Sequence, residues 1–126
     1  MFKFRGQSTL TGEWVTGWHF IDVGLEKHYI VSIGVPNEIH PSSLSISTGK
    51  LDSNKQEIFA SFEIDGVMTE GGDVVEGISG GAYPVFYNTD NTSFELKLRR
   101  IGKEVVLGSL YTNTLTIIGK GGGNDK

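Results

Sequence analysis

The stretch Ser93-Phe94-Glu95-Leu96-Lys97-Leu98-Arg99 alternates apolar and polar side chains without a break. Successive side chains of a β-strand point to opposite faces of the sheet, so this pattern places its apolar residues inward and its charged residues toward water. No segment of the chain keeps a helical period for the ~10–12 residues that an ordinary helix needs. The stretch therefore predicts a strand, and its surroundings predict a mainly β protein with little or no helix.

Further runs outside this stretch are short, rich in β-branched and aromatic residues, and bounded by Gly, Asn, Asp or Ser. They cover residues 13–20, 28–33, 58–64, 73–78, 82–87, 104–111 and 115–118. Asp65-Gly66 and Arg100-Ile101-Gly102-Lys103 have the composition of tight hairpin turns. Residues 37–47 are rich in Ser, Asn and Pro and predict a long surface loop with one short strand. Short strands separated by such turns are typical of an all-β barrel or sandwich.

Length and composition limit the class of protein. A chain of 126 residues with 37% hydrophobic residues has the size of one domain and enough apolar side chains for a core, which excludes general disorder. Without cysteine there is no disulfide framework and no thiolate metal site. No apolar run is long enough to span a bilayer, and Met1–Gly6 lacks the apolar region of a cleaved signal. We therefore expect a cytoplasmic protein with no membrane partner.

Charge is unevenly distributed, although the formal net charge is only −4. Acidic residues dominate positions 52–95, and a basic segment follows them, with Lys97, Arg99, Arg100 and Lys103. Two interpretations stay open. Lys and Arg protect an edge strand from pairing with other chains. Beside exposed aromatic rings they also form the surface that binds single-stranded nucleic acid, which makes these four residues the candidate nucleic-acid-binding site.

The sequence carries no recognisable catalytic, cofactor or metal motif. The three histidines, His19, His28 and His40, lack metal-ligand spacing. His19 and His28 can be neighbours across a turn at 25–27, either as a solvated surface pair, which we expect, or as a cross-strand pair with Asp22 or Glu26. Nothing pairs the carboxylates of Glu57, Glu63 and Asp73 in a cleft. Residues 77–81 lack G-x-S-x-G spacing, and residues 121–123 lack a P-loop helix. We predict a protein that is not an enzyme and holds no cofactor.

Residue order adds a family resemblance. Lys3-Phe4-Arg5-Gly6, followed by Thr11-Gly12-Glu13-Trp14-Val15, resembles the opening of the YopX family, which is encoded by phages and prophages. The resemblance continues through Pro41–Leu44, Thr48-Gly49, Asp52, Asn54, Glu57-Ile58-Phe59, and Val106, Gly108, Leu110, Tyr111, Asn113 and Leu115. The chain departs from the family where Ala60-Ser61-Phe62 replaces a Glu-Gly-Asp turn.

The resemblance implies a single module over residues 1–120. An antiparallel β unit at about 1–56 packs with a small SH3-like β barrel at about 57–118, and 119–126 form a flexible Gly-rich tail. Asp52 and Asn54 are expected to be Asx-turn residues. The family has no assigned biochemical role, so the resemblance predicts a non-enzymatic binding or accessory module in the bacterial host cell. Its partner is a second copy, a phage or host protein, or, in the alternative, nucleic acid.

Overall fold

The computed structural model describes residues 3–77, 80–100, 103–110 and 115–121, with backbone alone at 98–100 and 103–109. This part of the chain is mainly β, as predicted, and forms three antiparallel sheets. Its only helical element is a short 3-10 turn, η1, at Pro41–Ser43. The strands are β1 (Phe4–Gln7), β2 (Trp14–Asp22), β3 (Lys27–Ser32), β4 (Val35–Ile39), β5 (Ser45–Leu51), β6 (Glu57–Ala60), β7 (Glu63–Ile64), β8 (Val67–Met68), β9 (Asp73–Glu76), β10 (Ala82–Asn88), β11 (Ser93–Arg100), β12 (Lys103–Ser109) and β13 (Thr116–Lys120).

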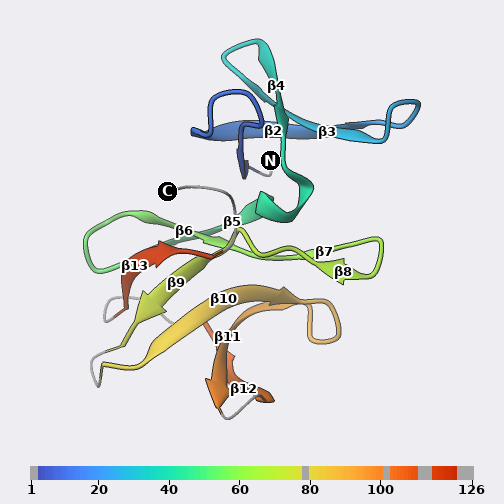
Figure 1. The fold of residues 1–126 in the computed structure, drawn as a ribbon. Helices are drawn as coiled ribbons and strands as arrows, with labels where there is room; N and C mark the ends of the chain where they lie inside the picture. Colours follow the sequence, from blue (N-terminus) through green and yellow to red (C-terminus); the bar gives the residue numbers. More distant parts are fainter. Residues whose placement is uncertain (1–2, 78–79, 101–102, 111–114, 122–126) are drawn as a thin grey trace.

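The first sheet contains six strands in the order β4-β3-β2-β1-β5-β6 (Figure 1). An isolated bridge between Ser8 and Ile39 and a hydrogen bond from the His40 amide to the Gln7 carbonyl (3.0 Å) link the end of β4 back to β1. Ile30, Ile39 and Leu44 form the buried core of this unit, and Phe4, Val15, Phe62 and Ile64 pack against it. The first four strands thus wrap around a core that a later segment, at 62–64, completes.

The second sheet contains β12-β11-β10-β9-β13, and the two-residue strands β7 and β8 form the third. The core of the second sheet combines apolar side chains of several strands and the segment before β13, with Ile58, Ala60, Val75, Val85, Leu96, Leu110 and Leu115 buried. Asp65 and Gly66, both with positive φ, close the predicted hairpin between β7 and β8. Within the described residues none of the three sheets closes on itself.

Hydrogen bonds at Ser61 connect the end of β6, in the first sheet, to β10 of the second. Ser61 pairs in parallel with Phe86 of β10, with bonds from the Ser61 amide to the Val85 carbonyl (3.0 Å) and from the Tyr87 amide to the Ser61 carbonyl (2.7 Å). The chain after β6 therefore continues onto the edge of β10. β6 itself belongs to the first sheet but places Ile58 and Ala60 in the core of the second.

The structure corrects several predicted boundaries. The region predicted as a surface loop at 37–47 contains the end of β4, η1 and the start of β5, and β1 was not predicted. Buried polar residues such as Gln7 and Ser45 interrupt the alternation of apolar and polar residues, so the sequence pattern did not indicate these strands. The strands form by pairing with their neighbours in the sheet. β13 extends to Lys120, into the segment predicted as a tail. Arg100 and Lys103 pair across the predicted hairpin, whose residues 101–102 lie outside the described part, as do residues 122–126.

Candidate functional site

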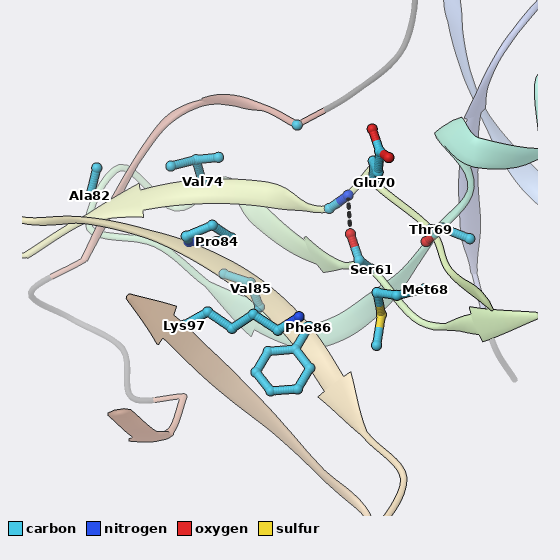
Figure 2. Close-up of a pocket in the computed structure, with 12 residues that line it drawn as sticks. Ser61, Met68, Thr69, Glu70, Val74, Ala82, Pro84, Val85, Phe86 and Lys97 are labelled. Atoms are coloured by element: carbon cyan, nitrogen blue, oxygen red, sulfur yellow. Dashed lines mark hydrogen bonds between the residues drawn. The ribbon is translucent and has the colours of Figure 1, made fainter. Parts of the chain in front are cut away.

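A groove of about 740 Å³ runs along one face of β10 (Figure 2). Ala82, Pro84, Val85 and Phe86 of this strand line it, and the side chains of Ala82, Pro84 and Phe86 share one face of the sheet. Val74 of β9 lies beside them, and Met68 of β8 and the following residues Thr69 and Glu70 form the opposite side. Strands that are distant in sequence thus build a trough with both apolar and polar groups in its lining.

Phe86, Met68 and Lys97 gather at one end of the groove (Figure 2). The Lys97 amine lies 4.4 Å from the centre of the Phe86 ring, within the range of a cation–π contact. This contact keeps a positive charge beside an apolar surface. Glu70 supplies the groove's carboxylate, and Ser61 and Thr69 supply its hydroxyl groups. This end of the groove therefore combines a positive charge with apolar side chains.

The back wall of the groove is held by backbone contacts at Gly71 and Gly72. The Gly72 amide donates to Ser61 Oγ (2.9 Å), and the Gly72 carbonyl accepts from the Gly121 amide (2.8 Å). The Glu70 amide donates to the Ser42 carbonyl (2.7 Å). A Cβ atom at position 71 would lie 1.8 Å from the Ser43 carbonyl oxygen, so only glycine allows this close approach. The wall is consequently fixed before any ligand binds.

A buried ion pair, which we call the Arg5–Asp73 clamp, supports this wall from behind. Arg5 Nη2 donates to Asp73 Oδ1 (2.9 Å) and to the Gly71 carbonyl (2.8 Å), and Asp73 Oδ2 accepts from the Phe59 amide (2.8 Å). The guanidinium lies 4.5 Å from the centre of the Phe59 ring and 5.4 Å from that of Trp14. Arg5 is 7% exposed and Asp73 1%. The clamp therefore ties β1 of the first sheet to β9 of the second.

Of the four predicted nucleic-acid-binding residues, Lys97 is the one whose side chain the structure describes. Lys97 lines the groove, whereas Arg99 pairs in register with Glu104 and Arg100 with Lys103, across β11 and β12. The side chains at 99, 100 and 103 lie outside the described part of the chain. Phe86 is only 6% exposed and Lys97 lies over its ring, so the ring offers no open face for a base. The assignment of these four residues to nucleic-acid binding stays a prediction.

The carboxylates of Asp52 and Glu57 accept hydrogen bonds from neighbouring groups, which are backbone amides for Asp52 and side chains for Glu57. Asp52 Oδ1 accepts from the amides of Asn54 (2.9 Å) and Gln56 (2.8 Å), which is the expected Asx turn, and Oδ2 accepts from Ile117 of β13 (3.0 Å). Burial acts to raise the pKa of Asp52, but these three hydrogen bonds outweigh it and the pKa lies below its usual value. Glu57 accepts from Lys3 (2.8 Å) and from the Ser47 hydroxyl.

His19 and His28 are neighbours, as the sequence allowed, but both rings are partly buried rather than solvated. The two rings bond to each other, and the Asp22 carboxylate accepts from the Leu25 amide rather than from a histidine.

Among the described residues no group of three or more His, Cys, Asp or Glu side chains is placed to hold a metal ion. In the same part of the chain no helix is long and apolar enough to cross a membrane.

Comparison with protein-family models and with curated proteins finds no match to this chain. The resemblance to the YopX family therefore stays a prediction from residue order. The structure gives the three residues at its point of departure a local role. Ala60 is buried in the second core, Ser61 bonds to Gly72, and Phe62 lies 5.8 Å, centre to centre, from the Phe4 ring.

Proposed function

We propose that this protein is a non-enzymatic binding module that takes an extended segment of a partner protein into the groove along β10. The observation that carries the proposal is the combination of an apolar floor with a wall fixed by the Arg5–Asp73 clamp and by Gly71 and Gly72. Preformed apolar concavities with a few polar groups are the usual form of ligand sites. A rigid wall lowers the entropic cost of binding.

The shape of the groove favours an extended chain. Its floor follows β10 from Ala82 to Phe86, which corresponds to roughly 13–14 Å at about 3.3 Å per residue. An extended peptide of four or five residues spans the same length. Apolar side chains of the peptide pack on Pro84 and Met68, and an acidic residue or a terminal carboxylate lies near the Lys97 amine.

An SH3-like arrangement of the C-terminal part belongs to the same proposal. Residues of β6, β9, β10 and β11 surround one core together with Leu115, which precedes β13, and this grouping supports a half-open barrel. The family resemblance supports an accessory role in a phage or prophage, with a phage or host protein of the bacterial cytoplasm as the partner. Nucleic acid is the alternative ligand, through Lys97, Arg99, Arg100 and Lys103. The carboxylate of Glu70 beside the groove and the covered ring of Phe86 favour a peptide.

Substitutions in β8 test the groove. Peptides are first selected for binding to the full-length protein from a displayed random-sequence library. They are expected to bind the Met68→Arg variant at least about ten-fold more weakly than the unaltered protein, because the charged arginine side chain fills the groove. Val67→Arg is the matched control: the neighbouring side chain alternates to the other side of the strand, is 69% exposed and does not line the groove. Ala82→Arg provides a second block at the other end. Calorimetric titration measures the affinities.

Two results contradict the peptide proposal. Selected peptides that bind Met68→Arg and Ala82→Arg as tightly as the unaltered protein do not use the groove. Binding of single-stranded oligonucleotides that weakens steeply with salt and is lost in Lys97→Glu favours the nucleic-acid alternative instead.

A further inference from the structure

His19 of β2 and His28 of β3 are joined by a hydrogen bond between one nitrogen of each ring. His19 Nε2 and His28 Nδ1 lie 3.0 Å apart, the ring planes differ by 6°, and the ring centres are 5.2 Å apart. These three values together require the rings to lie edge to edge in nearly one plane, with the two nitrogen atoms between the centres. In this geometry one nitrogen donates a proton to the lone pair of the other.

The pair lies on the face of the first sheet that carries the buried core of that sheet. His19 is opposite Ile30, and His28 is opposite Ile39, both core residues. The Phe4 ring lies 5.4 Å from the His19 ring, and the Phe62 ring lies 5.8 Å from that of Phe4. A row of rings thus connects the β2–β3 hairpin to the segment that leads onto β10.

Charged groups on the surrounding elements are engaged elsewhere. The opposite face of the sheet carries the side chains of Arg5 in β1, Lys27 in β3 and Glu38 in β4. Arg5 pairs there with Asp73, and Lys27 pairs with Glu38. Lys3, before β1, pairs with Glu57, and Asp22 of β2 accepts from the Leu25 amide. Glu63 of β7 is exposed and alternates with Phe62 and Ile64, which face the core. Asp22, Glu38 and Glu57 thus have partners elsewhere, and the causes that shift the pKa of His19 are burial and His28, with no carboxylate among them.

We propose that His19 and His28 form an acid-sensitive latch, which holds the β2–β3 hairpin against Phe4 and Phe62 and opens when both rings are protonated. A neutral or singly protonated pair keeps the hydrogen bond, because one nitrogen still carries a lone pair. Two protonated rings have no lone pair to share and place two positive charges 3.0 Å apart. The hairpin then separates from Phe4 while the second sheet, which contains no histidine, keeps its structure.

The direction of the pH effect follows from His19. Burial, and secondarily the charge of His28, lowers the pKa of His19 from 6.5 to about 4. A group whose pKa is lowered in the folded state stabilises that state above its ordinary pKa, here 6.5, and loses this contribution as the pH falls toward about 4. The latch therefore weakens through the mildly acidic range.

Amide hydrogen exchange, corrected for intrinsic rates, tests the latch. When the pH falls from near 7 to near 4.5, we expect the amide protection of residues 27–32 to fall about ten-fold relative to that of residues 82–88. The fall reflects the lowered pKa of His19, and solvent screening reduces its size. His19→Gln and His28→Asn keep a polar group at the bonding nitrogen but do not titrate, and their relative protection is expected to change less than about two-fold. His40→Gln, the control at the remaining histidine, is expected to respond like the unaltered protein.

The same loss of protection in His19→Gln or His28→Asn, or a loss spread evenly over both sheets, overturns the proposal. Imidazole nitrogen shifts of the unaltered protein give a measurement that needs no variant. The His19 ring is expected to titrate far below its ordinary pKa of 6.5. Titration of His19 near that ordinary value would also overturn the latch.

Discussion

Replacement of Asp73 by Ala is expected to lower the free energy of unfolding by about 3–5 kcal/mol, because it leaves the buried charge of Arg5 without a partner. The Phe59 amide loses its acceptor in the same step. Urea unfolding followed by far-ultraviolet circular dichroism measures the change. Arg5 lies in the first sheet and Asp73 in the second, so loss of the ion pair is expected to destabilise the whole chain rather than one sheet.

Exposed ion pairs provide the control for the clamp. Lys27→Ala removes a pair at 3.7 Å whose side chains are 47% and 37% exposed, and it is expected to cost less than about 1 kcal/mol. The double variant Arg5→Met, Asp73→Leu removes both charges together and is expected to be more stable than Asp73→Ala. A cost for Asp73→Ala no larger than that of Lys27→Ala would contradict the role assigned to the clamp.

Replacement of Asp52 by Ala is expected to cost about 2–4 kcal/mol, because a single carboxylate accepts three backbone hydrogen bonds. Two of them shape the turn before β6, and the third holds Ile117 of β13 across 65 residues of sequence. Asp52→Asn keeps one carbonyl oxygen and is expected to lose a smaller part of the stability. Urea unfolding at neutral pH measures both variants.

Acid is expected to reproduce part of the Asp52 effect. The pKa of Asp52 lies below its ordinary value of 3.8, so the stabilisation is complete above this value and is lost as the pH falls through the lower pKa of the folded state. Ser53→Ala is the matched control, since its hydroxyl bonds to Thr116 at an exposed position, and a cost under about 1 kcal/mol is expected. Equal losses for Asp52→Ala and Ser53→Ala would show that the carboxylate is not the anchor.

Alternation of side chains was sufficient to predict most of the strands. β2, β3, β10 and β11 lie where period-two patterns predicted them, and Asp65-Gly66 forms the predicted hairpin. These elements are visible locally because one face of each is apolar and positive φ at a turn favours Gly and Asp. The mainly β class follows from the same signal.

Elements that depend on distant polar partners could not be predicted. β1 contains the buried residues Arg5 and Gln7. Arg5 Nη2 donates to Asp73 and to the Gly71 carbonyl, and Gln7 Nε2 donates to the Gly12 carbonyl. Arginine and glutamine are mostly found at protein surfaces, so the sequence alone predicts that such residues are exposed. The Asx turn at Asp52 was predicted, but its bond to Ile117 joins positions that no local pattern relates.

The candidate site was predicted in part for a similar reason. The basic residue Lys97 was visible as charge, but the floor beside it consists of Ala82, Pro84 and Phe86, ordinary residues of an apolar run. An apolar run of this kind indicates a strand and does not say which face of it stays uncovered. Only the packing of the β7–β8 hairpin beside β10 makes that face one side of a groove.

Titration of a library-selected peptide into isotope-labelled protein tests the groove as the binding site most directly. We expect the largest amide and methyl shift changes at residues 68–70, 72–74, 82–86 and 97, with little change in the β2–β3 hairpin. Shift changes concentrated on the first sheet, or on β12 and the end of β11 away from Phe86, would contradict the assignment of the groove as the site of binding.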